Sequence, residues 1–162
     1  MNIYTGSYNN CNIGNLVSIS GDKGKSVGYI GNFYTKLAPK KSFWKKWHDN
    51  IGILTEDENN RYYMECYYDE VLKFLNPFEV VEELFEFGND VIMLCYENEN
   101  NFCHRHLVAA WLELELNIII EEVITLNNGD LKILEVKNEI KNSFKEIIIH
   151  SKKVRKLVNN KN

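Results

Sequence analysis

The segment from Asp90 to Glu115, DVIMLCYENENNFCHRHLVAAWLELE, constrains the fold more than any other part of the chain. It begins with a nearly continuous apolar run, which is typical of a strand buried on both faces. A polar loop follows, and then a helical apolar stripe made by Leu107, Ala110, Trp111 and Leu114. A second apolar run, NIIIEEVI, comes after the helix. Strand, loop, helix and strand in this order predict a βαβ unit with parallel strands.

The remaining patterns extend this unit into a larger sheet. NIYT and NLVSIS are short β-prone runs, so four buried strands are expected. RYYMECYYDEVLKFL is an amphipathic helix, whose tyrosine pairs we assign to the core or to a groove wall rather than to a stacking platform. Asn76 and Pro77 begin a further helix that ends near Gly88. These elements predict a three-layer α/β fold, with a mainly parallel sheet of about four or five strands and flanking helices.

The length of 162 residues fits one domain, and no linker divides the chain. We expect residues 1–126 to form the α/β domain. Between Asp130 and Val158 apolar residues recur at roughly helical intervals. Residues 127–162 are therefore expected to be a C-terminal helical extension packed on the same domain.

The lack of targeting signals and the spacing of the cysteines indicate the cellular compartment in which the protein is expected. No apolar run approaches the roughly 20 residues that span a bilayer, and the N-terminus is polar where a signal peptide is apolar. The four cysteines are irregularly spaced and do not form a disulfide framework. We expect a soluble, cytoplasmic protein without a membrane partner, in which any special cysteine is chemical rather than structural.

Charge is distributed unevenly along the chain, although the net charge is only −4. Between Lys23 and Lys46 there are seven lysines and no carboxylate. Such a run is either a solvated face or a basic lip beside a site for phosphate or nucleic acid. In KKSFWKKWHDN, Trp44 and Trp47 alternate with lysines, a composition used for stacking on single strands. At this spacing they also fit one helix face packed on the sheet, which we favour.

A glycine-rich loop, SGDKGKSVGYIGN, follows the second predicted strand. It is not a phosphate-binding loop of the Walker type, because the first glycine of that motif would fall at Ile19 and no helical pattern follows. Its lysines are nevertheless candidates to bring positive charge over a ligand at the strand ends. The candidate anion-binding lysines are Lys23, Lys25 and Lys36.

The Cys103, His104 and Arg105 triplet lies where a central strand has ended and a helix begins, the usual ligand position in open α/β sheets. The first turn of a helix has unpaired N–H groups that suit an anion. Cys103 is the candidate nucleophile, with His104 beside it, and Arg105 is the candidate anion-binding group. Glu97 is placed to orient a partner or to move a proton. Together they predict an active or binding site for an anionic ligand.

A metal site from Cys95, Cys103, His104 and His106 is the alternative use of these residues. We do not expect it, because adjacent residues of a helix point in different directions and the spacing matches no common zinc pattern. Cys95 at the end of an apolar strand is most simply a small buried hydrophobe. The sequence assigns no cofactor.

The residues also resemble a known family. YT near the start, LVSIS, YTKLAP and above all DVIMLCYENENNFCHRHLVAAWL are similar to the DUF488 family of small bacterial, archaeal and phage proteins, over about Ile3 to Val123. The resemblance implies an α/β domain whose characteristic site contains Cys95, Glu97, Cys103, His104 and Arg105. It adds Tyr4, Thr5 and Ser20 as supporting candidates at the strand ends. Many members resemble Asp-Val-Arg where this chain has Ser18, Ile19 and Ser20, so this member lacks that pair or uses other groups, such as Lys23 or Lys25.

Three classes of function remain open. The leading hypothesis is an enzyme acting on a nucleotide, nucleobase or nucleic-acid group through the Cys-His-Arg site. The second is a non-catalytic module that binds nucleic acid or a nucleotide, in phage or host defence. A structural interaction protein is the third, and the sequence does not define an oligomeric state.

Overall fold

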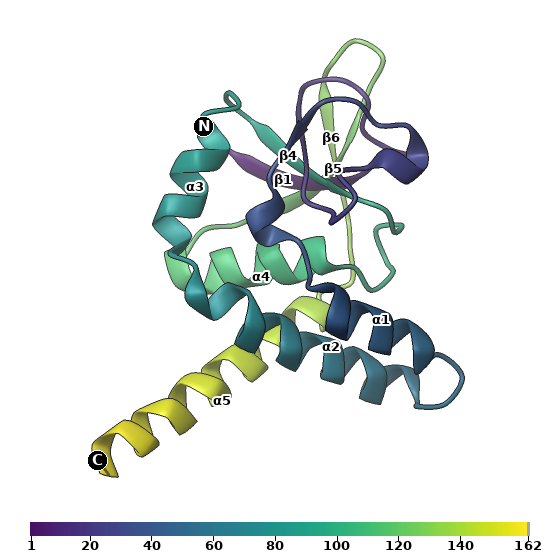
Figure 1. Ribbon diagram of the computed structural model, residues 1–162. Helices are drawn as coiled ribbons and strands as arrows, with labels where there is room; N and C mark the ends of the chain where they lie inside the picture. The colour runs from purple at the N-terminus through teal and green to yellow at the C-terminus, as the bar shows by residue number, and fades with distance from the viewer. Residues whose placement is uncertain (162) are drawn as a thin grey trace.

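The computed structural model describes residues 1–161 and shows a six-stranded, mostly parallel sheet with helices packed on it (Figure 1). The strands are β1 (Ile3–Ser7), β2 (Asn15–Ser18), β3 (Asn32–Phe33), β4 (Val91–Cys95), β5 (Glu121–Thr125) and β6 (Leu131–Leu134). The α-helices are α1 (Lys41–Asp49), α2 (Glu56–Glu70), α3 (Pro77–Phe85), α4 (His104–Leu116) and α5 (Glu139–Lys161). Short 3₁₀ turns are η1 (Lys25–Val27), η2 (Thr35–Leu37) and η3 (Leu72–Phe74). The predicted α/β class and the β4–α4–β5 unit are confirmed.

The strand order is β3-β2-β4-β1-β5-β6, with every neighbouring pair parallel except β5 and β6. β4 is therefore central, between β2 and β1. The sheet has more strands than the four or five expected, because β3 contains only two exposed residues and β6 lies where a helical pattern was expected. Both strands are at the edges of the sheet, where little apolar periodicity is required.

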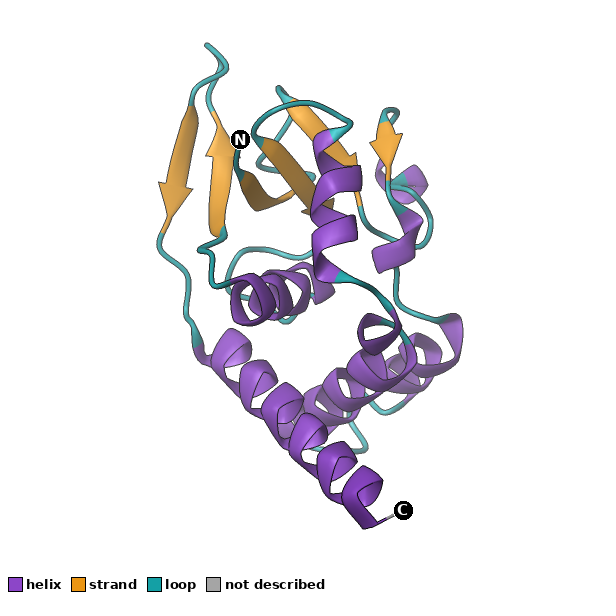
Figure 2. Cartoon of the chain, turned by 90° about the vertical axis from the view of Figure 1, so that its left-hand side faces the viewer, coloured by secondary structure: helices purple, strands orange, loops and turns teal. Residues whose placement is uncertain are grey.

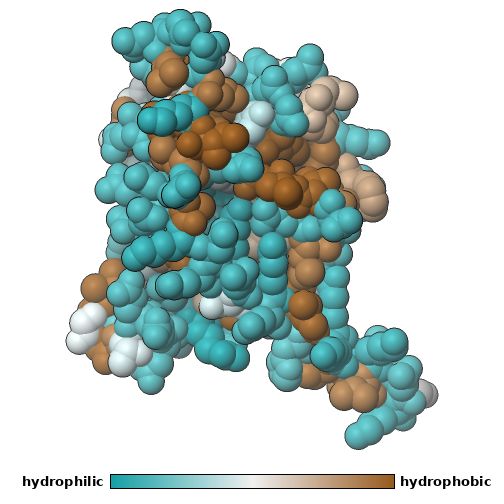
Figure 3. Space-filling view, turned by 180° about the vertical axis from the view of Figure 1, so that it is seen from behind, coloured by the Kyte–Doolittle hydropathy of each residue, from teal (hydrophilic) through white to brown (hydrophobic). Residues whose placement is uncertain are grey.

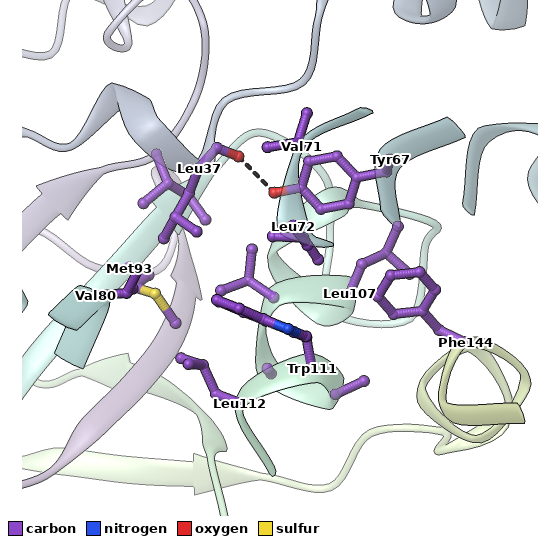
Figure 4. Close-up of a cluster of buried hydrophobic side chains, with 14 of the residues drawn as sticks. Leu37, Tyr67, Val71, Leu72, Val80, Met93, Leu107, Trp111, Leu112 and Phe144 are labelled. Carbon is purple, nitrogen blue, oxygen red and sulfur yellow. Dashed lines mark hydrogen bonds between the residues drawn. The ribbon is translucent and has the colours of Figure 1, made fainter. Parts of the chain in front are cut away.

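The two faces of β4 pack in different surroundings. Val91 and Met93 belong to the main core on the helical side, whereas Ile92 and Leu94 belong to a smaller cluster on the other face. On the helical side α4 contacts β1 and β4, and α5 and α2 lie beyond α4 (Figure 2). Sheet, α4 and the outer helices thus form three layers. Trp111 of α4 lies in the middle of the main core (Figure 4).

Helix α2 begins earlier than its apolar pattern indicates. Thr55 forms a capping box with Glu58, each side chain bonding the other residue's backbone N–H. Tyr63 and Tyr67 are buried, and the Tyr67 hydroxyl donates to the carbonyl of Leu37 (Figure 4). The core assignment of the tyrosine pairs is therefore confirmed.

The C-terminal region differs in part from the predicted helical extension. Residues 131–134 form β6, and a helix begins only at Glu139. The first half of α5 packs on α4 through Lys141 and the buried Phe144. Its second half projects from the body of the protein (Figure 1), and Figure 3 shows apolar side chains along this projecting part. Leu157, for example, is 62% exposed.

Among residues 1–161, none of the helices has both the length and the apolar character that a bilayer crossing requires.

Candidate functional site

Two cysteines and a histidine meet at the carboxyl end of β4. Cys95 is the last residue of β4, Cys103 caps the amino end of α4, and His104 is the first residue of that helix. One potential metal-ligating atom from each residue lies within 4.8 Å of the others, and all three residues are buried. His104 Nδ1 is 3.4 Å from Cys95 Sγ, and His104 Nε2 is 2.9 Å from the carbonyl oxygen of Ile19.

The partner of Nε2 fixes how the histidine ring is protonated. A carbonyl oxygen can only accept a hydrogen bond, so Nε2 must hold the proton that it donates to Ile19. In the neutral ring the lone pair is then on Nδ1, which faces the sulfur of Cys95. This tautomer makes His104 a proton acceptor or a metal ligand on the side of the two sulfurs.

The expectation that Cys103 and His104 point apart is wrong. Cys103 has φ −153° and ψ 143°, which is extended backbone rather than helix. An extended cap followed by a helical residue turns both side chains toward the end of β4. Adjacency in sequence therefore does not separate these two side chains in space.

The environment acts differently on the two thiols. Burial raises the pKa of the Cys95 thiol well above its usual range. Burial also raises the pKa of Cys103, but a hydrogen bond from the Cys95 thiol and the positive charge of Arg105 outweigh it and hold the pKa well below its usual range. Of the two sulfurs, Cys103 is the one that the surroundings stabilise as a thiolate.

Arg105 has a structural partner. Its side chain has no exposed surface, and Nε and Nη2 donate to Oε1 of Glu122 on β5 at 3.1 Å and 2.8 Å. Thr5 of β1 donates its hydroxyl to the other oxygen of the same carboxylate, at 2.5 Å. The guanidinium is enclosed and paired with a carboxylate, which favours a structural role for Arg105 over the anion-binding role expected from the sequence.

A pocket of about 830 Å³ opens over the Cys-His cluster. Its wall comes from α1, from the loop after β2, from the β4–α4 loop and from Tyr63 of α2. The ring-bearing residues of the wall are Trp44, Trp47, His48, Tyr63, Tyr96, Phe102 and His104. Cys95 and Cys103 line the same pocket, so the cluster is reached from it although each residue is buried.

The two tryptophans of α1 are placed differently from the expectation that both pack on the sheet. Helix α1 packs against α2, and Trp44 is 44% exposed at the pocket wall. The Trp44 ring lies 4.3 Å from the His48 ring between centroids. Trp47 donates its Nε1 proton to Asn60 at 3.1 Å and contacts the ring of Phe102. The pair forms one aromatic side of the pocket.

Some of the other predicted site residues line the pocket, and the rest lie outside it. Within residues 1–161, Glu97 and Ser20 line the pocket, whereas the three candidate lysines do not. Lys36 pairs with Glu83 at 2.8 Å. Lys23 lies over the ring of Phe33 at 4.2 Å, and Lys25 is in the exposed turn η1. Tyr4 packs in the smaller apolar cluster, on the other face of the sheet.

Sequence reasoning missed Asp22, which organises the loop after β2. Its carboxylate accepts hydrogen bonds from the backbone N–H groups of Gly24 and Ser26, at 2.9 Å and 3.1 Å, and from the hydroxyls of Ser26 and Tyr96. Burial acts to raise the pKa of Asp22, but these donors together hold it well below its usual range. An Asp two residues before a Gly, as in Asp-Lys-Gly, indicates a side-chain-stabilised turn, and that signal was present in the sequence.

Lys41 belongs to the lysine-rich run that was considered as a basic lip, but nothing in the sequence separates it from its neighbours. It is the first residue of α1 and is the lysine that the pocket wall contains within the described chain. Lys41, and none of the three candidate lysines, therefore lies at the pocket within residues 1–161.

The protein is therefore of the α/β class and has a Cys-His cluster at the carboxyl end of its central strand. The chain belongs to the DUF488 family: residues 11–116 match the model DUF488-N3a, which is described as the active DUF488-N3 subclade. No curated protein and no solved structure matches the chain.

Proposed function

We propose that this DUF488 protein is an enzyme acting on a nucleobase-bearing substrate, either a nucleotide, a nucleoside or a base of a nucleic acid. The observation behind the proposal is the pocket, whose aromatic wall leads to the Cys95, Cys103 and His104 cluster. Its volume of about 830 Å³ falls in the range of pockets that enclose small ligands. Aromatic walls with reactive groups at the base suit a planar substrate.

Base stacking supplies the affinity in this proposal. Trp44 is the most accessible large ring of the wall, and its partial exposure leaves a face for a ligand. Stacking of one nucleobase on an aromatic side chain is worth about 1–3 kcal/mol. Phe102 and Tyr96 belong to the loop between β4 and α4, so a base in the pocket lies close to the amino end of α4.

Lys41 and the amino end of α4 are the groups for the anionic part of the substrate. A helix amino end attracts a phosphate or carboxylate through its unpaired N–H groups and its dipole. Lys41 is exposed, lines the pocket and is the first residue of α1. This assignment replaces the sequence hypothesis that placed the anion on Arg105.

The reactive groups are Cys103, His104 and Glu97. The lone pair of His104 Nδ1 faces the sulfur side of the cluster, which suits proton transfer or ligation there. Glu97 lies in the loop directly after β4 and is exposed in the pocket wall, where it can exchange protons with a substrate. All three residues line the pocket.

Calorimetric titration with a panel of nucleosides and nucleotides tests the binding part of this proposal. Trp44→Ala should weaken binding about 10-fold or more, which corresponds to the loss of one stacking contact. Phe74→Ala is the matched control, because Phe74 is an aromatic residue that is 73% exposed in η3, outside the pocket. Equal affinity of both variants would contradict the aromatic wall as the binding surface.

Turnover is tested separately, by mass spectrometry of the same compounds after incubation with the protein. Conversion by the native protein and its loss in Cys103→Ser and Glu97→Gln, with binding retained, are the expected results. Binding without conversion of any compound would favour the second candidate function, a non-catalytic binding module. The exposed lysines of α1 beside Trp44 favour that module for single-stranded nucleic acid.

A further inference from the structure

We infer that Cys95, Cys103 and His104 form a binding site for a borderline-soft divalent metal ion, for which Zn²⁺ is the reference, with one coordination position open to the pocket. The inference deepens the proposed function by assigning chemistry to the cluster. Binding of the ion itself does not require that function, since all three ligands belong to this chain. Two thiolates and an imidazole are the ligand types that Zn²⁺ prefers.

The distances fit a tetrahedral ion without rearrangement of the fold. Zn–S bonds of about 2.3 Å and Zn–N bonds of about 2.0–2.1 Å place a sulfur and a nitrogen ligand about 3.5 Å apart in tetrahedral coordination. The observed separation of Cys95 Sγ and His104 Nδ1 is 3.4 Å. The atom offered by Cys103 is within 4.8 Å of both. The three atoms can therefore share one ion after small side-chain adjustments.

The hydrogen bond from Nε2 of His104 is of the kind that metal-binding histidines make with the ring nitrogen that does not hold the metal. A ligating histidine almost always donates its second ring N–H to a carbonyl, carboxylate or water, which fixes the tautomer and the ring plane. Nε2 of His104 makes this bond to the backbone of Ile19 at 2.9 Å. Nδ1 is therefore left with its lone pair directed at the sulfurs before any ion binds.

Charge balance also favours a divalent ion. Two thiolates neutralise the charge of Zn²⁺, and the neighbouring buried Arg105 and Glu122 neutralise each other at 2.8 Å. A filled site would thus add no net charge to the interior, which avoids the cost of burying an unpaired charge. His106, the fourth ligand considered from the sequence, is not part of the group that the structure brings together.

Three protein ligands on one side of the ion are typical of a reactive site rather than a structural one. Structural zinc sites are closed by four protein ligands, whereas catalytic sites keep a position for water or substrate. Cys95, Cys103 and His104 all line the pocket, so the free position faces the space assigned to the substrate. A metal ion there supplies a Lewis acid and lowers the pKa of a bound water.

Cobalt substitution tests the site directly. The purified chain, stripped of metal with a chelator under reducing conditions, is titrated with Co²⁺ and then with Zn²⁺. We expect one equivalent of Co²⁺ to produce a sulfur-to-cobalt charge-transfer band and the intense visible bands of tetrahedral Co²⁺, and Zn²⁺ to abolish both. Absence of these bands in the native chain would overturn the inference, and this measurement needs no variant to fold.

Single variants then identify the ligands. Cys103→Ser and His104→Ala should each weaken Zn²⁺ binding in competition with a chromophoric chelator by more than the 10–100-fold that loss of a second-shell partner costs. Cys66→Ser and His150→Ala are the matched controls, because Cys66 lies in α2 and His150 is exposed on α5. Equal losses in the controls would show that the ion binds elsewhere.

The test also separates this inference from the proposed function. Nucleotide binding without the cobalt spectrum would overturn the metal site and leave Cys103 as a free thiol in the proposed enzyme. The cobalt spectrum without binding of any nucleobase compound would support the metal site and contradict the proposed substrate class.

Discussion

Arg105 of α4 donates from Nη2 to Oε1 of Glu122 on β5 across 2.8 Å, and neither side chain is exposed by more than 1%. The pair joins the helix that begins at the site to the neighbouring strand β5, and Thr5 extends it to β1. An arginine beside a cysteine and a histidine resembles an anion-binding residue in sequence. In the structure its charge is used inside the protein.

Replacing Arg105 with Gln should destabilise the ligand-free protein by about 3–5 kcal/mol, because it leaves the Glu122 carboxylate buried without its cation. Chemical denaturation measures the change. Arg61→Gln is the control, since Arg61 makes only an exposed pair with Glu65 and should cost less than about 1 kcal/mol. A ligand-free stability that is unchanged in Arg105→Gln would restore the anion-binding role.

Helix α5 is predicted to be an integral part of the domain rather than a removable extension. Phe144 is fully buried and contacts the ring of Tyr67, so Phe144→Ala should cost about 3–5 kcal/mol. Leu157→Ala, in the projecting half of the same helix, should change the free energy of unfolding by less than about 0.5 kcal/mol. Similar small effects of both substitutions on the denaturation midpoint would mean that α5 folds independently of the sheet.

The Asp22 turn should depend on pH in a defined direction. The pKa of Asp22 is lower in the folded protein than in the unfolded chain, where it is about 3.9. Its contribution to stability is therefore fully present above that value and is lost as the pH falls through the lower folded pKa. Carboxyl chemical shifts should show Asp22 titrating below the value of about 3.9 that an aspartate has in an unfolded chain. Titration of Asp22 at that ordinary value would contradict the hydrogen-bonded turn.

Lys41 should contribute to any binding of single-stranded oligonucleotide. Each phosphate contact adds about 0.7 to the slope of log affinity against log salt, so Lys41→Gln should reduce the slope by about that amount. Lys132→Gln on β6, at the edge of the sheet, is the control and should leave the slope unchanged. No binding even at low salt, or equal slopes for both variants, would remove the nucleic-acid form of the proposed function.

Much of the fold could be predicted because its central elements have strong periodicity. The apolar run of β4 and the stripe of α4 each repeat with one clear period, and both were located correctly. β3 and β6 could not be located in this way. Their residues are mostly exposed or half-buried, so the pairing of backbone with β2 and β5 determines them rather than side-chain burial.

The site was predictable as a set of residues more than as a geometry. The sequence indicates that Cys103 and His104 begin a helix, but only the extended backbone of Cys103 brings the two side chains together. The partner of Arg105 lies 17 residues further along the chain, on strand β5, and a single sequence contains no signal for that pairing. The aromatic wall depends likewise on the position of α1 against α2, which is set by tertiary packing.

The bond from His104 to the carbonyl of Ile19 has a consequence for how the family can vary. The side chain of Ile19 is fully buried in the core, while its carbonyl oxygen holds the imidazole. A main-chain oxygen is supplied by every amino acid, so point mutation at positions 18–20 alters the side chains there without deleting the acceptor. The Ser-Ile-Ser of this chain, where the resemblance to the family implies Asp-Val-Arg, is thus compatible with an unchanged orientation of the imidazole. In the evolution of such proteins, drift at the end of β2 can alter the chemistry around the ring while the ring keeps its orientation.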